Sequence, residues 1–503
     1  MRQAVLKSLY DLHSWVGLVL GLILYIVCFS GVVALFDAEL GPWDRGDVRA
    51  YGGPAPAGLD RAVAHVVGGI ADEGRGVNFT VRLPTPYRQT VAVDHRGADG
   101  PVTEQFDPMT GEPVPSRGSV STTILTRLHT DLLLPQPWGR YLVGGLGIVM
   151  LLSVISGVIL HRKIIRDAFT LRLDRSLRLK WTDLHKAVGL WGLPFHFTMA
   201  LTGAILGFVG LILMYTAVVA FKGDLGSAAA EMMAPGVIAT GEAAPMMPVS
   251  ALIEMAGEAL PGIVPEVVMV RAYGDSGAVA EVMGNVPGSL VYYPSVSLEA
   301  ATGAVLGVTD WSAGGIGKRV YAMVTPLHYA SYGGFALKVL YALLGAGSCF
   351  LVVSGLSIWH ARPHGRATMQ HLTTGVVYGL PLAIAGLLVA GRVAAPAFAA
   401  DERGMTLLFL LFCCPGVAWP WLRGAARAAS EMLLGTGLLL AAFPALTIVG
   451  GGAESYQVWG VAGAPVATAD IAGFLLGLGA LAWGMAEGRR LRRRHDRGAD
   501  FQD

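Results

Sequence analysis

Eight long apolar stretches restrict what this chain can fold into. Each is close to the roughly 20 residues that a helix needs to cross the hydrocarbon core of a bilayer. They cover residues 14–36, 139–160, 187–208, 335–358, 373–391, 405–422, 432–449 and 468–485. Because 53% of the residues are hydrophobic and only 15% are charged, the composition is also too apolar for a soluble protein of this size. We therefore predict an α-helical integral membrane protein with about eight transmembrane helices.

Arginine and lysine residues are concentrated in alternate loops between these stretches. They precede the first stretch and follow the second, fourth, sixth and eighth, with the densest groups in residues 162–184 and 488–503. Positively charged loops tend to stay in the cytoplasm, so we expect a multi-pass protein of the bacterial inner membrane with both termini cytoplasmic. The net charge of only +1 argues against nucleic acid as a partner and leaves membrane lipid as the expected surroundings.

The predicted organisation alternates membrane helices with loops and modules. Its segments are a first transmembrane helix at 1–36, a periplasmic module at 37–126, a second helix at 127–161, a basic cytoplasmic loop at 162–184, a third helix at 185–221, a second periplasmic module at 222–334, a fourth helix at 335–360, a four-helix extension at 373–487 and a basic cytoplasmic tail at 488–503. No role is predicted for the four-helix extension.

The two segments expected in the periplasm share a pattern. Each begins with a helical stretch, near 60–71 in the first and 249–259 in the second, and continues with short alternating runs typical of β-strands. Each ends in a similar turn, Asp107-Pro-Met-Thr-Gly-Glu in the first and Glu299-Ala-Ala-Thr-Gly-Ala in the second. We interpret the two segments as copies of one small α+β module.

The membrane helices repeat as well. Leu12-His13 and Leu184-His185 begin the first and third helices, and Ser30-Gly31 matches Thr202-Gly203 at the same offset. Likewise, one pair of histidines precedes the second and fourth helices and another pair follows them. These pairs are His129 with His328 and His161 with His360. The first four helices therefore predict a parallel internal duplication, helix–module–helix repeated in the same orientation.

Six histidines at or near these helix ends are the candidate site residues: His13, His129, His161, His185, His196 and His328. An imidazole at membrane depth is costly and is normally retained for function or for a specific partner. Zinc or copper would require ligands gathered in one cluster, and a proton relay would require carboxylates among the histidines. Haem requires two imidazoles that face each other across an apolar slot. Since the neighbouring sequence is rich in Gly, Leu, Val and Phe, we interpret the six as axial ligands of b-type haems.

The depth of these histidines adds a second inference. Three lie at cytoplasmic helix ends and two at periplasmic ends, while His196 would lie about 16 Å beyond His185 on one face of a continuous helix. The duplication makes His129 and His328 the expected ligands of an outer haem. The inner haem would take its ligands from the other four, and spacing does not choose among them. Candidate ligands near both membrane surfaces suit a transmembrane electron carrier.

Other residues that bind metals elsewhere have plainer interpretations here. His360, His364 and His371 lie among arginines near a short inner loop and are expected to be ordinary interfacial residues. The four cysteines all lie inside apolar runs and are expected to be packing residues. They are Cys28, Cys349, Cys413 and Cys414.

Several segments carry a family resemblance. They are Leu12-His13-Ser-Trp15-Val-Gly17-Leu18, Ser156-Gly157-Val-Ile-Leu-His161, Asp183-Leu-His185-Lys, Leu193-Pro194-Phe195-His196 and Ser354-Gly355-Leu-Ser-Ile-Trp359. Over about residues 1–365, the chain resembles the PepSY-associated transmembrane family. The turn at Asp107 resembles the Asp-Pro-x-Thr-Gly turn of PepSY domains, whereas the second turn has Glu299-Ala300 in place of Asp-Pro.

The resemblance implies a function. Members of this family are described as iron-regulated inner-membrane proteins, and some are di-haem reductases of ferric siderophores. The chain would then hold two haem b groups and pass electrons from the cytoplasmic side, or from quinol, to periplasmic ferric iron in a siderophore or another ferric chelate. The donor would be quinol or a separate cytoplasmic reductase, because the longest cytoplasmic loop is far too short for a dinucleotide-binding unit of more than about 100 residues.

A membrane transporter or permease is the alternative interpretation. It would move an iron–siderophore complex or another solute, with the PepSY-like segments as periplasmic regulatory modules. This alternative predicts broken helices that carry ion ligands near the middle of the membrane. In the sequence, Pro194 and Pro444 are the only hints of such breaks, and neither has an acidic neighbour.

Overall fold

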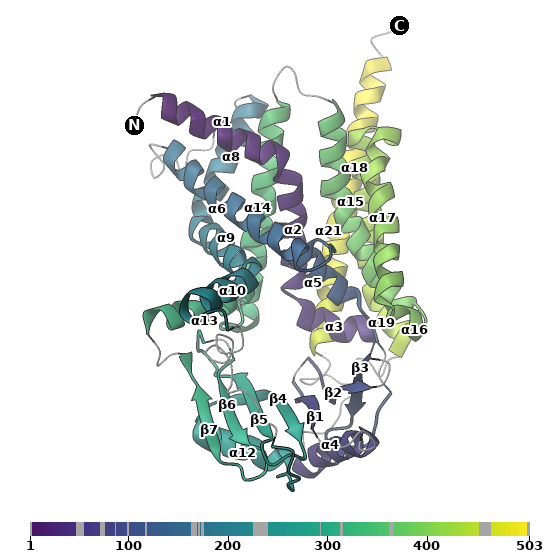
Figure 1. The fold of residues 1–503 in the computed structure, drawn as a ribbon. Helices are drawn as coiled ribbons and strands as arrows, with labels where there is room; N and C mark the ends of the chain where they lie inside the picture. Colours follow the sequence, from purple (N-terminus) through teal and green to yellow (C-terminus); the bar gives the residue numbers. More distant parts are fainter. Residues whose placement is uncertain are drawn as a thin grey trace.

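The computed structural model describes most of the chain and is drawn in Figure 1. The described residues are 3–46, 55–70, 76–85, 87–97, 100–115, 118–161, 169, 172, 176–224, 240–291, 293–311, 315–361, 367–451 and 464–499. Most of the predicted basic loop at 162–184 lies outside them, as does His364.

Apolar helices form the larger part of the molecule. Six are long and apolar enough to cross a membrane by themselves. They are α6 (Trp138–Leu160), α14 (Gly334–His360), α15 (Ala367–Val393), α17 (Glu402–Arg423), the consecutive helices α18 (Ala425–Ala441) and α19 (Phe443–Gly451) taken as one span, and α21 (Ala464–Ala499). Two bent helix pairs bring the number to as many as eight within the described residues. The chain is therefore an α-helical, multi-pass membrane protein.

The two bent pairs correct the prediction of continuous first and third helices. The first pair, α1 (Gln3–Val19) and α2 (Gly21–Ala34), bends by 64°, and the second, α8 (Leu177–Trp191) and α9 (Leu193–Gly207), bends by 71°. Pro194 lies in the first turn of α9, where its missing N–H costs no helical hydrogen bond. His185 and His196 therefore lie in different helices, and the spacing expected along one helix face does not hold.

The strands of both predicted modules join in one antiparallel sheet. It has seven strands in the order β3-β2-β1-β4-β5-β6-β7. Their bounds are β1 (Val77–Arg82), β2 (Val91–Gly97), β3 (Gly100–Phe106), β4 (Val264–Tyr273), β5 (Val279–Asn285), β6 (Ser295–Glu299) and β7 (Val305–Thr309). Helices α4 (Pro56–Ile70) and α12 (Val249–Ala259) cover one face of the sheet, as Figure 1 shows.

The sequence predicted two copies of an α+β module and did not say how they are arranged; the structure joins their strands in one sheet. β1 pairs with β4, with Val81 opposite Val268, and both side chains are fully buried in a single apolar cluster that also includes residues of α4 and α12. A three- or four-stranded half would leave β1 or β4 as an unpaired edge, which is an exposed template for further pairing. Pairing the two halves covers both edges. The sheet and its two helices thus form one α+β unit.

The two turns singled out in the sequence have similar local structure. Gly111 has φ +73° and Gly303 has φ +76°, a conformation that favours glycine. The amide of Gly111 donates to the carbonyl of Asp107, and that of Gly303 donates to the carbonyl of Glu299, each at 2.8 Å. The replacement of Asp-Pro by Glu-Ala in the second turn therefore leaves this backbone hydrogen bond in place.

Short helices connect the membrane helices to the sheet. They are α3 (Asp37–Arg45), α5 (Ser121–Asp131), α10 (Val209–Ala220) and α13 (Ile316–Tyr329). Glu39 of α3 accepts a hydrogen bond from Lys338 of α14 at 2.8 Å, and the Lys338 ammonium lies 5.6 Å from the ring of Tyr87. Because Tyr87 belongs to the turn between β1 and β2, these three residues connect the sheet to the short helix α3 and to the membrane helix α14.

The first and last described helices have their chain ends on the same side of the molecule. In Figure 1, the beginning of α1 and the end of α21 lie at the end opposite the sheet. We call the two sides the terminal end and the sheet end. Helix α21 extends to Ala499 and so includes most of the predicted basic tail. Together α15, α17, α18 and α21 form a bundle beside the other membrane helices.

Candidate functional site

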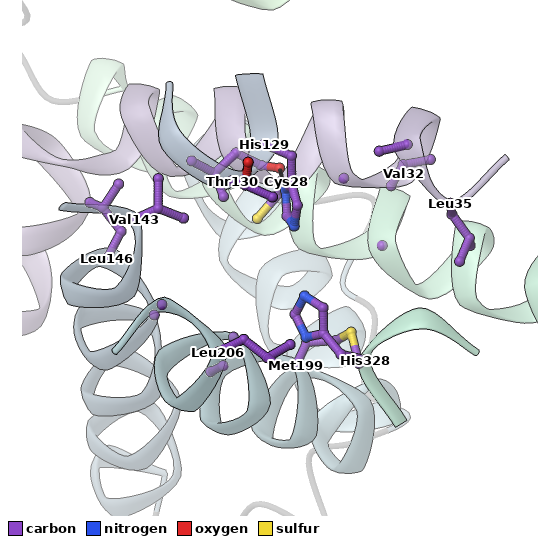
Figure 2. A pocket seen from close by; sticks show the side chains of 18 of the residues that line it. Cys28, Val32, Leu35, His129, Thr130, Val143, Leu146, Met199, Leu206 and His328 are labelled. Atoms are coloured by element: carbon purple, nitrogen blue, oxygen red, sulfur yellow. Dashed lines mark hydrogen bonds between the residues drawn. The ribbon is translucent and has the colours of Figure 1, made fainter. Parts of the chain in front are cut away.

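Two of the predicted histidines meet near the sheet end. His129 lies on α5 and His328 on α13, and their ring centroids are 6.0 Å apart with an angle of 28° between the ring planes. In Figure 2 the two imidazoles point toward one another from opposite walls of a cavity. We call His129 and His328 the sheet-side pair. The duplication in the sequence predicted this pairing, and the structure brings the two rings together.

A second pair of histidines meets closer to the terminal end. His13 lies on α1 and His185 on α8, and their ring centroids are 6.4 Å apart with an angle of 89° between the planes. We call them the terminal-side pair. Sequence spacing left four candidates for the inner ligands, and the fold brings these two together because α1 packs on α6 and α14, and α8 also packs on α14.

Both separations match those of two imidazoles bound to one metal. An imidazole nitrogen ligates a metal at about 2 Å, so two rings on opposite sides of the metal have centroids about 6 Å apart. Aromatic rings that contact each other have centroids about 4.5–7 Å apart, which includes both separations. The spacing of the two pairs is thus compatible with two imidazoles on one metal and does not by itself require a metal.

Hydrogen bonds at Nδ1 determine which ring nitrogen is free in the sheet-side pair. His129 Nδ1 lies 2.8 Å from the carbonyl oxygen of Val27, which can only accept. His328 Nδ1 lies 2.9 Å from Thr202 Oγ1, whose own proton is donated to the carbonyl of Thr198. In both rings Nδ1 must therefore carry the proton, and Nε2 presents its lone pair. This is the form in which a histidine ligates a metal, with Nδ1–H oriented by a second group.

The terminal-side pair has the same arrangement. His13 Nδ1 lies 3.0 Å from Ser156 Oγ, and His185 Nδ1 lies 2.8 Å from Ser354 Oγ. Each serine donates its proton to a backbone carbonyl one turn earlier, at 3.1 Å. Its oxygen is left as the acceptor for Nδ1–H. All four paired histidines thus have an Nε2 lone pair available.

An apolar cavity of about 250 Å³ separates the sheet-side imidazoles. Its walls come from α2, α3, α5, α6, α9, α10, α13 and α14, and Figure 2 labels some of the lining side chains. Most of the lining residues are apolar, and the charged ones are Asp37 and Arg140. A mostly apolar cavity with a few polar groups is typical of a site for a small molecule or cofactor.

Glycines allow the imidazole rings to pack closely against neighbouring helices. A Cβ at Gly31 would lie 2.7 Å from the His129 ring, and one at Gly203 would lie 3.2 Å from the His328 ring. At the terminal-side pair the corresponding contacts are looser, because a Cβ at Gly157 or Gly355 would be 3.6 Å from the nearer ring. The sheet-side histidines therefore depend on glycine more strongly than the terminal-side ones.

The other two predicted ligands lie outside these pairs. His161 caps the end of α6, and His196 is buried on α9 with its Nδ1 2.9 Å from Ser348 Oγ. The Nε2 of His196 has no hydrogen-bond partner and lies close to Gly192, at the break between α8 and α9. His360 closes α14 and hydrogen-bonds to the carbonyl of Leu356 at 2.7 Å. Among the described residues, no cluster of three or more His, Cys, Asp or Glu side chains could hold a metal ion.

The partners of Nδ1 are the functional residues that the sequence did not identify. Ser156 and Ser354 stood in segments noted only for their family resemblance, and Thr202 stood in a repeated dipeptide. Each is followed by a glycine that lies against a paired histidine. The repeated hydroxyl–glycine dipeptides were thus a usable signal. Val27 carried no such signal, because its contribution is a backbone carbonyl.

Known proteins resemble the first part of the chain in sequence. The uncharacterized protein PA4219 of Pseudomonas aeruginosa is 32% identical to the chain over 356 residues, which cover 64% of the chain and 89% of that protein. The family described as "PepSY-associated TM region" matches residues 10–362, which include all four paired histidines and end just before α15. The chain belongs to the PepSY-associated transmembrane family.

Proposed function

We propose that this protein is a haem-b-containing reductase of the bacterial inner membrane that passes electrons across the membrane to ferric iron. The observation that carries the proposal is the presence of two facing imidazole pairs, each at the spacing of trans axial ligands, at two levels of one helical bundle. The ligands would be His129 and His328 at the sheet end and His13 and His185 nearer the terminal end.

The residues present fit haem. A porphyrin supplies four ligands to its iron, so two imidazoles complete the coordination. Each pair offers two Nε2 lone pairs and hydrogen-bonded Nδ1 atoms, and the sheet-side pair adds an apolar cavity with glycines against both rings. Arg140 in the cavity wall is a cation able to pair with a haem carboxylate.

Bound haem would supply one-electron redox chemistry, and the chain's own residues would determine where that chemistry occurs. His185 and Thr202, the hydrogen-bond partner of His328, are separated along α8 and α9 by a path of at most about 25 Å. The apolar helices around both pairs would shield the redox sites from water. The bundle would therefore keep two redox sites in fixed positions between its two ends.

The proposed direction of electron transfer and the proposed substrate rest on family resemblance and topology. Basic residues around the terminal end support a cytoplasmic location for that end and both termini, and thus a periplasmic location for the sheet. Electrons would enter from quinol or from a separate cytoplasmic reductase. They would leave at the sheet-side pair to a ferric siderophore or another ferric chelate bound between the sheet and the membrane helices.

An absorption spectrum of the detergent-purified protein tests the proposal. We expect a Soret band with sharp α and β bands after dithionite reduction, and two haems for each chain. His129→Ala and His13→Ala should each remove one haem and leave the other. A protein that stays colourless after incubation with haem would contradict the proposal.

The broken helices favour a second candidate, a transporter. The bends of 64° and 71° are a feature that the transporter interpretation predicted. The breaks fall at Leu20 and Gly192, whose neighbours are apolar apart from the buried His196. A transporter would move a ferric chelate into protein-containing vesicles in the absence of any reductant. The reductase proposal predicts no such uptake and the formation of Fe(II) only when an electron donor is supplied.

A further inference from the structure

The C-terminal helices contact one half of the histidine-bearing core. They begin after the region that matches the family, and α15, α17 and α21 pack against α2, α3 and α5. Helix α5 carries His129, and α2 carries the Val27 carbonyl that accepts the Nδ1 proton of His129. The C-terminal helices therefore touch both elements that orient this one imidazole.

Three contacts hold α5. The guanidinium of Arg127 pairs with Glu402 at the start of α17, and the amide of Val120, just before α5, donates to the carbonyl of Ala399 at 3.1 Å. Gly391 of α15 lies against Ser121, the first residue of α5, so closely that a Cβ there would overlap the serine hydroxyl. These contacts act at both the beginning and the middle of α5.

Further contacts hold α2 and α3. The hydroxyl of Tyr25 on α2 donates to the carbonyl of Val377 on α15 at 3.0 Å. Trp43 on α3 stacks on Phe443 at 3.9 Å between centroids and donates its indole N–H to the buried Asp470 at 2.8 Å. One apolar cluster joins the two sides of this contact. It includes Leu22, Ile124, Leu125 and Leu128 from the core and Leu380, Leu387, Met405 and Phe409 from the C-terminal helices.

The elements around His328 are packed differently. Helix α13 packs on α9, and α9 packs on α6. Ile316 and Val320 at the start of α13 have exposed fractions of 84% and 56%, whereas the equivalent part of α5 is covered by α15 and residues near α16 (Pro396–Ala399). Within the sheet-side pair, the helix that carries His129 is therefore more extensively packed at its start than the helix that carries His328.

We propose that the C-terminal helices are a positioning element for the sheet-side pair and act on it through His129. The proposal rests on the proposed haem-binding function. By fixing α5 and the Val27 carbonyl together, the C-terminal helices hold the His129 ring at the angle and distance that ligation requires. Ligand orientation by surrounding groups of this kind commonly has a large effect on metal affinity. The C-terminal helices reach the terminal-side pair mainly through α14, which carries Ser354 and contacts α15, so this pair serves as an internal reference.

Two glycine variants of the full-length protein test this proposal. Gly391→Ala places a methyl group onto the Ser121 hydroxyl and against the Asp44 carboxylate, so that these side chains or α15 must shift, whereas Gly479→Ala adds the same methyl group to α21 at a position with no other atom within 4 Å. The two haems can be told apart by their ferric electron paramagnetic resonance signals, because near-parallel and perpendicular imidazole planes split the iron d orbitals differently. We expect Gly391→Ala to lose or shift the sheet-side signal and to keep the terminal-side signal. Gly479→Ala should keep both.

A charge variant gives a second, milder test. Glu402→Gln removes one of the two carboxylate partners of Arg127 and leaves Asp131, and Glu431→Gln removes comparable ion pairs with Arg423 and Arg427 inside the C-terminal bundle. We expect Glu402→Gln to shift the sheet-side signal and Glu402→Asp, which keeps the charge, to retain it, with Glu431→Gln silent.

The outcomes separate the two proposals. If both haem signals are present in the wild type and neither Gly391→Ala nor Glu402→Gln changes the sheet-side signal beyond its control, the positioning proposal is wrong and haem binding stands. If Gly391→Ala changes both signals equally, the C-terminal helices support the bundle in general and the proposal is also overturned. A wild-type protein without haem would overturn the proposed function itself.

Discussion

The sheet-side and terminal-side pairs share a spacing and differ in almost everything that surrounds it. The ring planes meet at 28° in the sheet-side pair and at 89° in the terminal-side pair. The Nδ1 partners are two matched serines at the terminal-side pair, but a backbone carbonyl and a threonine at the sheet-side pair. The terminal-side pair is thus symmetric in its hydrogen-bond partners, and the sheet-side pair is not.

The asymmetry lies in which acceptor each Nδ1–H finds. Ser30 occupies the position that matches Thr202, and both hydroxyls donate to the carbonyl four residues earlier, but His328 bonds to the Thr202 hydroxyl and His129 bonds to the carbonyl of Val27. His129 therefore lies almost against the backbone of α2 at Gly31. The comparison teaches that a repeated sequence can conserve the distance between two ligands while it changes how firmly each is held.

Removal of a ligand should give the largest effect. His129→Ala or His328→Ala should abolish the sheet-side haem and spare the terminal-side haem, and His13→Ala or His185→Ala should do the reverse. The reason is that an imidazole truncated to a methyl group leaves the iron without one axial ligand. Haem-to-protein ratios and reduced spectra of the four variants measure this. Loss of both haems in every single variant would break the division into two independent pairs.

The second-largest effect is expected from the glycines beside the rings, because Gly→Ala should affect the two pairs differently. Gly31→Ala places a methyl group 2.7 Å from His129, and such overpacking typically costs about 1–3 kcal/mol. Gly157→Ala makes only an ordinary contact with His13 at 3.6 Å, and replacing a helical glycine by alanine typically stabilises by about 0.5–1 kcal/mol. Thermal unfolding and haem retention should therefore worsen in the first variant and stay level or improve in the second. Equal thermal stability and haem retention in the two variants would show that the tighter packing at Gly31 does not affect stability.

The hydroxyl partners should give smaller effects. Thr202→Val removes the acceptor for His328 Nδ1–H, and Ser354→Ala does the same for His185. Loss of such an orienting group typically costs about 10–100-fold in metal affinity. Haem titration of the apoprotein should show a weakened sheet-side site in Thr202→Val and a weakened terminal-side site in Ser354→Ala. Ser153→Ala, whose side chain bonds only to its own helix, is the control and should bind haem normally.

The sequence predicted much of the helical part and one of the two pairs. Long apolar runs predicted the membrane spans. The matched positions of His129 and His328 indicated that they would meet, since a parallel repeat would relate their helices by an approximate twofold axis. The pairing of His13 with His185 was not predictable. Four histidines remained as candidates, and only the long-range packing of α1 and α8 on α14 brings His13 and His185 together.

The helix breaks and the pairing of the two halves of the sheet could not be predicted from the sequence, and both have physical reasons. Pro194 hinted at the break before α9, but a proline in the first turn of a helix is also compatible with a straight start, and nothing comparable marks the break at Leu20. The pairing of β1 with β4 joins strands separated by two membrane helices. Local patterns indicate that each strand forms, and long-range packing decides which edges meet.

Electron transfer across a sealed vesicle tests the central claim most directly. Vesicles containing the haem-loaded protein and a trapped ferric chelate with a chromophore for Fe(II) would receive a membrane-impermeant reductant outside. Wild-type protein should generate internal Fe(II), and His13→Ala or His129→Ala should fall to the rate of vesicles without protein, because either variant interrupts the path at one level. Unchanged rates in both variants, or no internal Fe(II) with the haem-loaded wild type, would contradict a transmembrane path through the two histidine pairs.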